Sequence, residues 1–424
     1  RHLLTQGQPV AHAGIPTLEH HINLLRNLIA TASIPLLEIP PIPAGCSFIA
    51  CLTHDVDHVG VRNHKFDHTM FGFLYRALVV STLNFFRGRG PLRHVWKSWK
   101  AAASLPFVYL GWARDFWWPF DWYLDVEKGL GATYYFIPFK RRAGENVTVP
   151  DASRRASAYD VSDIPQLLQT LKETGCEVGV HGIDAWHSVE KGREELERVN
   201  SCAGGCDRGI RMHWLLQNSQ TFSVLEKAGF SYDSTAGYNE AVGYRAGTGQ
   251  VYRPPGVKKL LELPMHIQDG ALFFPGRLNI SEEGATRLCE GFIARARRLG
   301  GVITVIWHDR SHAAERFWGE FYARLVASLR ELSVWFATGQ QITSWFRRRR
   351  EVVFERQGSD VKVHAASTGN SGLPAMRLRM HLPGAGGKTA SRDVIWDGSS
   401  SGDVAEIFHQ QWDAREAHAF AKQA

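Results

Sequence analysis

The chain has 424 residues, of which 44% are hydrophobic and 21% are charged, and these fractions exclude a disordered or fibrous protein. The formal net charge of +7 favours anionic surfaces or substrates. The basic residues are scattered, and their one dense run, Arg347 to Arg350, ends a predicted helix, so no nucleic-acid partner is expected. Six cysteines in so long a chain form no disulfide framework, which predicts a reducing, cytoplasmic location.

Residues 1–45 are predicted to be a helical lead-in that ends in a proline-rich link. From residue 46 to about residue 350, short apolar runs alternate with amphipathic helices. The runs are Ser47 to Leu52, Ala132 to Ile137, Glu177 to Val180, Val302 to Trp307 and Ser333 to Phe336. This alternation predicts an α/β fold with a parallel sheet, in a chain long enough to close the sheet into a barrel.

Two regions depart from this alternation. Residues 58–125 are rich in aromatic side chains and are predicted to form a helical insertion. Its most apolar stretch, Phe71 to Phe86, contains Arg76 and is too short to span a bilayer, so at most a peripheral membrane contact is expected. After residue 350, alternating runs predict a small β module over residues 351–385, and residues 386–424 are predicted to be a polar, flexible tail.

Two aspartates follow the first predicted strand. Asp55 and Asp57 lie at the C-terminal end of this strand, where parallel α/β folds build their active sites. Carboxylates this close repel each other unless a cation lies between them or one is protonated. A metal ligand beside a general base meets that condition, and two capping aspartates in a turn are the alternative.

Histidines end two later strands in the same way. His181 ends one apolar run, and His308 ends another and is followed by Asp309. A histidine at the same sheet edge as an aspartate pair is a suitable ligand for a divalent metal, and one beside a metal-bound water can protonate a leaving amine. Arg245 lies in a predicted turn, where it either aims the base carboxylate or is solvated.

Together these segments resemble the polysaccharide deacetylase family, carbohydrate esterase family four. The resemblance implies a distorted (β/α) barrel of about seven strands. By the same resemblance Asp55 is the catalytic base, Asp57 and His181 are metal ligands, Arg245 orients the base and His308 is the catalytic acid. The residues predicted to line the substrate site are Tyr244, Trp186, His213 and Asp309.

The third metal ligand departs from the family's pattern. The family's second motif has histidines at i and i+4, but the i+4 position from His181 is Ala185. The next imidazole, His187 at i+6, is therefore the predicted ligand, and His58 and His213 are rivals. The cofactor expected from the resemblance is a divalent metal, with zinc first and cobalt, nickel or manganese as alternatives.

The function predicted from these residues is metal-dependent hydrolysis of an amide, the N-deacetylation of an N-acylated sugar or polysaccharide. One alternative is an amidohydrolase for a small ureide-like substrate, which the same groups would serve. The other is a non-catalytic saccharide-binding protein with a degraded metal site, and the missing i+4 histidine is its main support.

Overall fold

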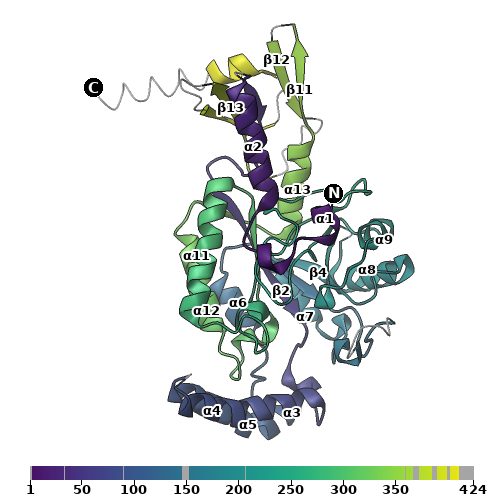
Figure 1. Ribbon diagram of the computed structural model, residues 1–424. Helices are drawn as coiled ribbons and strands as arrows, with labels where there is room; N and C mark the ends of the chain where they lie inside the picture. Colours follow the sequence, from purple (N-terminus) through teal and green to yellow (C-terminus); the bar gives the residue numbers. More distant parts are fainter. Residues whose placement is uncertain are drawn as a thin grey trace.

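The computed structural model describes residues 2–32, 34–88, 90–145, 152–205, 207–358, 360–365, 372–383, 389–398 and 402–409. Its centre is a parallel sheet in the order β7-β6-β5-β4-β3-β2-β9-β8, with β10 also paired to β2 (Figure 1). The strands are β2 (Phe48–Val56), β3 (Ala132–Phe136), β4 (Glu177–Gly182), β5 (Gly209–Met212), β6 (Tyr232–Asp233), β7 (Leu261–Glu262), β8 (Ile267–Gln268), β9 (Val302–Ile306) and β10 (Val334–Phe336). The sheet curls without closing, because its end strands β7 and β8 are not paired with each other. This confirms the predicted distorted (β/α) barrel, with nine strands where about seven were expected.

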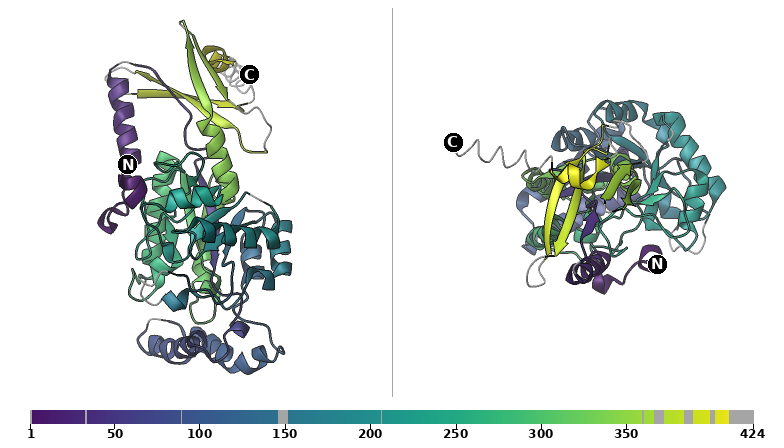
Figure 2. Two further views of the ribbon diagram at one scale, coloured as in Figure 1. Left: turned by 90° about the vertical axis from the view of Figure 1, so that its right-hand side faces the viewer. Right: turned by 90° about the horizontal axis from the view of Figure 1, so that it is seen from above.

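Helices surround the curled sheet when it is viewed along its axis (Figure 2, right). They are α7 (Pro165–Glu173), α8 (Val189–Ala203), α9 (Thr221–Ala228), α10 (Asp269–Phe273), α11 (Glu282–Leu299), α12 (Gly319–Arg330) and α13 (Gly339–Arg350). Side-chain caps fix the N-terminal ends of α8 and α11. Ser188 accepts a hydrogen bond from the N–H of Lys191, and Ser281 accepts one from the N–H of Gly284. One apolar stripe of each helix packs on the sheet, which is buried on both faces and therefore consists of continuous apolar runs.

The insertion after β2 is helical. It consists of α3 (His68–Leu74), a π-helical segment (Tyr75–Val80), α4 (Ser81–Phe86) and α5 (Leu92–Tyr109), and α6 (Phe120–Val126) leads back to β3. We call the part from α3 to α5 the helical hairpin. It lies beneath the barrel in Figure 1, at the end opposite the β module.

The β module contains parts of both ends of the chain. Strand β1 (Leu36–Glu38) of the lead-in, which follows α1 (His2–Gln6) and α2 (Thr17–Thr31), pairs with β13 (Met376–Pro383), and β13 pairs with β14 (Thr389–Trp396). A second sheet contains β11 (Val352–Gln357), β12 (Asp360–Ala365) and β15 (Gly402–Asp403). The prediction of a flexible tail from residue 386 is thus wrong for β14 and β15, because apolar side chains such as Val394 and Trp396 are buried in the module. Residues 410–424 lie outside the described residues.

Candidate active site

The predicted base, Asp55, lies near the end of β2 and is buried. Its Oδ1 accepts a hydrogen bond from Arg211 Nη1 at 2.7 Å. The same guanidinium donates to Thr53 Oγ1 at 2.9 Å and to the Ser234 carbonyl at 3.0 Å, which fixes its position. Burial acts to raise the pKa of Asp55, but the charge and hydrogen bond of Arg211, together with the charges of His181 and His308, outweigh it and the pKa is lowered. Asp55 is therefore ionised at neutral pH, as a general base must be.

Arg245, which was predicted to orient this base, is not beside it. Its Nη1 instead donates to the backbone carbonyl of Gly237 at 2.8 Å. Arg211 on β5 takes the predicted position next to Asp55. The sequence does contain a signal for this role, since Arg211 is a charged residue inside an apolar strand. A buried charge requires a partner of opposite charge.

Asp57, His181 and His213 each offer one ligand atom, and these atoms lie within 4.8 Å of one another. Asp57 Oδ1 is 3.4 Å from His181 Nε2 and 3.5 Å from His213 Nε2. The three residues lie on or directly after β2, β4 and β5 of the same sheet, in which β4 and β5 are neighbours and β3 lies between β2 and β4. One carboxylate and two imidazoles are a ligand set that suits zinc and similar divalent metals.

Hydrogen bonding and protonation at these residues fit a divalent cation. His181 Nδ1 lies 2.9 Å from the Arg211 carbonyl and so carries its proton there, which leaves the lone pair of Nε2 directed at Asp57. Burial lowers the pKa of His213 to about 3, so this imidazole is neutral at physiological pH. Among the described residues, Asp57 Oδ1 and His213 Nδ1 are buried without a hydrogen-bond partner. A buried carboxylate oxygen left unpaired between two imidazole nitrogens is costly unless a cation binds it.

His187, the predicted third ligand, lies outside this group. Its Nε2 is 3.4 Å from Asp184 Oδ1. Glu195 accepts hydrogen bonds from the N–H groups of Ile183 and Asp184 at 3.0 and 2.7 Å, so the loop after β4 is held in a turn that does not carry position i+6 back to the metal group. The third position is filled by His213, which sequence reasoning had named as a rival.

The other rival, His58, faces away from the group. Its Nδ1 lies 3.0 Å from His64 Nε2, and its ring packs near Trp117. His58 therefore belongs to the packing between the barrel and the helical hairpin, and not to the ligand set.

The predicted acid, His308, follows β9 and is held by an aspartate that sequence reasoning missed. His308 Nδ1 lies 2.6 Å from Asp269 Oδ1, and the His308 backbone N–H donates to Asp269 Oδ2 at 2.8 Å. Burial acts to lower the pKa of His308, but the charge and hydrogen bond of Asp269, together with the charges of Asp57 and Asp55, outweigh it and raise this pKa to about 10. His308 is therefore protonated at neutral pH, as a general acid must be. Asp269 follows a strand of two residues, β8, which is too short to be detected from periodicity.

Three residues predicted to line the substrate site have other contacts. Tyr244 is buried and packs against Phe292. Trp186 is buried, and its carbonyl accepts a hydrogen bond from the hydroxyl of Thr221 at 2.9 Å. Asp309 lies beneath the site, where its Oδ1 accepts the Asp57 backbone N–H at 3.0 Å. Burial and the charge of Asp57 raise the pKa of Asp309 to about 7.

The base, the ligand set and the acid open into one cleft of about 140 Å³. Its further lining residues are Trp214, Leu215, Asn239, Gln268, Gly270, Phe274, Arg277 and Arg316. The guanidinium carbons of Arg277 and Arg316 lie 5.8 and 5.9 Å from the centre of the Phe274 ring. Neither arginine forms an ion pair with a carboxylate among the described residues, so both leave positive charge at the cleft.

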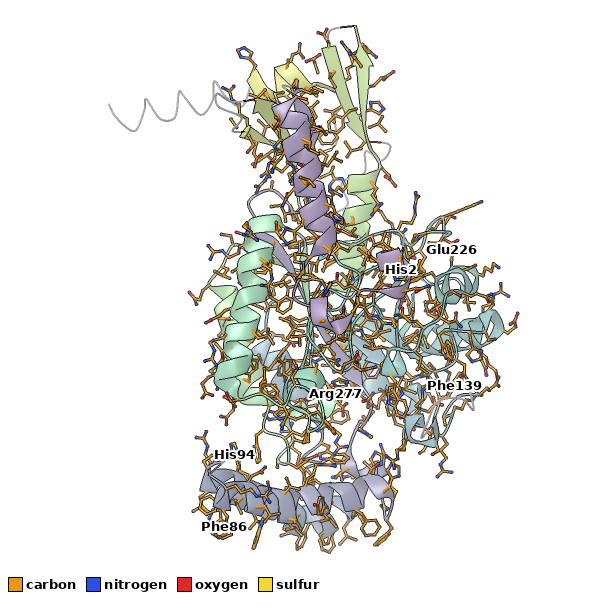
Figure 3. All side chains as sticks on the ribbon, viewed as in Figure 1. His2, Phe86, His94, Phe139, Glu226 and Arg277 are labelled. Carbon is orange, nitrogen blue, oxygen red and sulfur yellow. The ribbon has the colours of Figure 1, made fainter. Side chains whose placement is uncertain are left out.

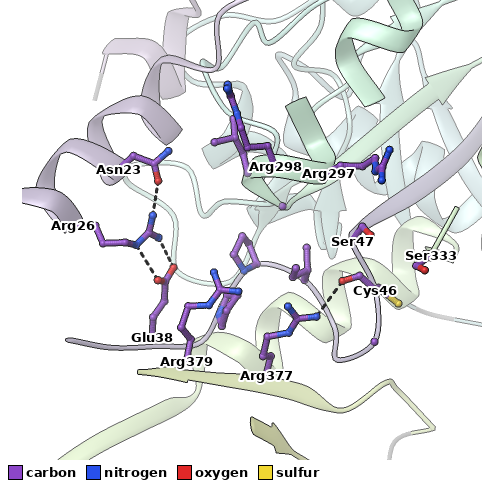
Figure 4. Close-up of a pocket in the computed structure, with 16 residues that line it drawn as sticks. Asn23, Arg26, Glu38, Cys46, Ser47, Arg297, Arg298, Ser333, Arg377 and Arg379 are labelled. Atoms are coloured by element: carbon purple, nitrogen blue, oxygen red, sulfur yellow. Dashed lines mark hydrogen bonds and ion pairs between the residues drawn. The ribbon is translucent and has the colours of Figure 1, made fainter. Parts of the chain in front are cut away.

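A second cavity, of about 400 Å³, lies between the barrel and the β module (Figure 4). It is lined by five arginines, of which Arg26 is paired with Glu38 at 2.6 Å and Arg377 donates to the Cys46 carbonyl. Burial raises the pKa of the Cys46 thiol, which disfavours a nucleophilic thiolate. The cavity lining contains neither a histidine nor an aspartate, and its one carboxylate, Glu38, is held in an ion pair by Arg26, so a general acid–base pair converges in the cleft and not here.

No family model and no curated protein matches the chain. Among solved structures, the chain is similar to proteins assigned as polysaccharide deacetylases from Mycobacterium smegmatis (18% identity, 74% of this chain and 96% of that chain, TM-score 0.43) and Pseudomonas aeruginosa PAO1 (14% identity, 73% and 94%, TM-score 0.45). It is also similar to Puue allantoinase (14% identity, 73% and 93%, TM-score 0.41). At these identities and TM-scores the likeness assigns neither a reaction nor a substrate, which have to be inferred from the residues of the cleft.

Proposed function

We propose that this protein is a metal-dependent hydrolase that removes the acyl group from an N-acylated sugar. The observation that carries the proposal is the convergence of three sets of groups in one cleft. These are an ionised base held by Arg211, a ligand set of Asp57, His181 and His213, and a protonated acid held by Asp269.

The chemistry follows from the protonation states. A divalent ion bound by the ligand set would polarise the amide carbonyl and lower the pKa of the attacking water. Asp55 accepts the proton of that water as the water attacks the carbonyl carbon. His308 donates its Nε2 proton to the departing amine, and the acyl group leaves as the carboxylic acid. Arg211 and Asp269 hold the two groups in opposite protonation states at the same pH.

The cleft lining supports a substrate that is polar and anionic. Trp214 and Phe274 offer aromatic faces of the kind that pack on sugar rings, and Arg277 and Arg316 add positive charge. A cleft of about 140 Å³ is smaller than the roughly 300–1,000 Å³ of pockets that enclose a whole drug-sized ligand, so it would take the acylated end of a glycan.

The same small volume supports a second candidate, an amidohydrolase for a small ureide. The third possibility, a saccharide-binding protein without activity, has less support, because His213 supplies the imidazole whose absence was its main argument.

The experiment that tests the proposal is a substrate screen of zinc-loaded protein against N-acetylated mono- and oligosaccharides and ureides, with acid release as the readout. We expect acetate release from the sugars and its loss, by at least about 10³-fold, in Asp55→Asn with zinc still bound. The matched control, His187→Ala, removes a titratable group outside the ligand set and should keep activity. Release from ureides alone would favour the second candidate, and an Asp55→Asn variant with full activity would refute the assignment of the base.

A further inference from the structure

The helical hairpin exposes an unusual amount of apolar surface. Among the described residues, 25 large hydrophobic side chains are exposed, and 13 of them lie between residues 66 and 112. Phe86 is 78% exposed, Trp96 69% and Trp112 74%. Single exposed hydrophobic residues are ordinary on soluble proteins, but a contiguous exposed apolar patch marks an interaction surface.

The exposed residues lie on one face of each helix of the hairpin. On α5 they are Leu92, Trp96, Trp99 and Phe107, which recur at helical spacing. On α3, the π-helical segment and α4 they include Phe71, Tyr75, Leu83 and Phe86. The opposite face of α5 packs on the barrel, where the Ser98 hydroxyl donates to the Ala314 carbonyl at 2.8 Å. Figure 3 shows His94 on the side that faces the barrel and Phe86 on the side that faces away. The hairpin is therefore apolar on two sides. Among the described residues, the barrel covers the inner side and nothing covers the outer side.

The charge of the same segment identifies what covers the other side. Residues 61–114 contain nine Lys or Arg and a single acidic residue, Asp67, so this segment has a net charge of +8 and the rest of the chain sums to −1. Arg87 and Lys100 are exposed on the same segment. Apolar and aromatic side chains flanked by Lys and Arg are the pattern of helices that lie in the interface of an anionic membrane. A second protein would require matching acidic and apolar surface, whereas a bilayer with anionic headgroups supplies both.

The hairpin is built to lie on a bilayer and not to cross it. The expectation that the apolar stretch is too short to span a bilayer is wrong as to length, because the helix begins before Phe71. Among the described residues, His68–Phe86 has the length and composition of a membrane-spanning helix. However, Arg76 lies near its middle, and a charge at the centre of a spanning helix costs about 2.5–3.5 kcal/mol. The buried side chains Phe73 and Ala77 also pack in one cluster with α5 and with Ala313 of the barrel, which ties the helix to the body of the protein.

We propose that the helical hairpin docks this protein on the surface of a bilayer rich in anionic lipid, with α3, α4 and α5 in the plane of the interface. The hairpin packs on the loop after β9, which also supplies Arg316 to the cleft. Docking therefore turns the end of the barrel that carries this loop toward the membrane. The proposal does not depend on the reaction, because it concerns binding alone.

The test is co-sedimentation of the full chain with vesicles of phosphatidylcholine alone and of phosphatidylcholine with one part in four phosphatidylglycerol. A variant carrying Phe86→Ser, Trp96→Ser and Phe107→Ser is compared with the wild type. The matched control carries Leu24→Ser, Leu25→Ser and Leu28→Ser, which change residues of α2 that are also more than half exposed. We expect binding to the anionic vesicles that is weakened by salt, falls at least tenfold in the hairpin variant and changes less than twofold in the control.

A second variant keeps the proposal testable if the serine variant does not fold. Arg87→Glu with Lys100→Glu leaves every apolar contact in place and should weaken binding to anionic vesicles about tenfold. Wild-type protein that stays in the supernatant with anionic vesicles would overturn the proposal. Equal losses of vesicle binding in the hairpin and α2 variants would also overturn it. A wild-type dimer in sedimentation equilibrium that binds no vesicles, and that dissociates in the hairpin variant, would do the same.

Discussion

Replacing Arg211 with methionine is the sharpest test of how the base is held. The Arg211 side chain is fully buried, and its guanidinium lies 2.7 Å from Asp55 Oδ1. Arg211→Met fills a similar volume but leaves Asp55 buried without this partner. Removing one member of a buried ion pair costs about 3–5 kcal/mol, a large part of the roughly 5–15 kcal/mol by which a typical domain is stable.

The cost should depend on pH, because Asp55 is the group left unpaired. In the wild-type protein the lowered pKa of Asp55 contributes stability that is present above its unfolded-state pKa of about 3.9 and is lost as the pH falls. In Arg211→Met burial raises this pKa instead, so the variant loses stability as the pH rises above about 4. We therefore expect the difference in free energy of unfolding, measured by urea titration in EDTA, to grow between about pH 4 and pH 7.

Two further variants separate the ion pair from the loss of a long side chain. Arg245→Met removes a guanidinium that donates to a backbone carbonyl and should cost about 1 kcal/mol without the same pH dependence. Adding Asp55→Asn to Arg211→Met removes the stranded charge and should recover at least about 1.5 kcal/mol. Equal costs for the two methionine variants, or additive effects of Arg211→Met and Asp55→Asn, would refute the reasoning.

The other predictions concern the metal, the acid and the substrate. His213→Ala should weaken zinc binding by more than about 100-fold, since loss of an outer partner alone costs about 10–100-fold, while His187→Ala should change it less than threefold in a competition titration with a chelating dye. Asp269→Asn should lower the pKa of His308 from about 10, so the alkaline loss of kcat/KM should move to lower pH; an unmoved profile would exclude His308 as the acid. Arg316→Glu should raise KM about tenfold for an anionic N-acylated sugar and leave that of a neutral one unchanged, and an equal rise for both would exclude charge recognition.

The fold was predictable from the sequence where elements are long. The runs that became β2, β3, β4, β9 and β10 are continuous apolar segments, and the helices between them have caps and apolar stripes that can be recognised. Strands β6, β7 and β8 have two residues each, which is too short for any periodicity. The pairing of β1 with β13 in the β module joins segments more than 330 residues apart. No local sequence pattern encodes such a pairing.

The candidate site was predictable where a residue follows a recognisable strand. Asp55 and His308 meet this condition, and the cleft contains both. Arg211 and His213 were harder to place, because β5 has four residues, Gly209–Met212, and one of them is charged. Spacing along the chain favoured His187, but the hydrogen bonds of Glu195 to the loop turn that residue away.

The segment from Arg211 to His213 explains how this site dispenses with a histidine one helical turn after His181. Strands β4 and β5 pair with His181 opposite Arg211. The Arg211 side chain holds the base, and the Arg211 carbonyl fixes the proton on His181 Nδ1. The strand ends at Met212, and His213 follows it directly. The register between β4 and β5 therefore determines how the base is held, which tautomer His181 adopts and where His213 lies. A change that shifts this register should impair proton transfer and metal binding together, whereas a substitution at His187 should impair neither.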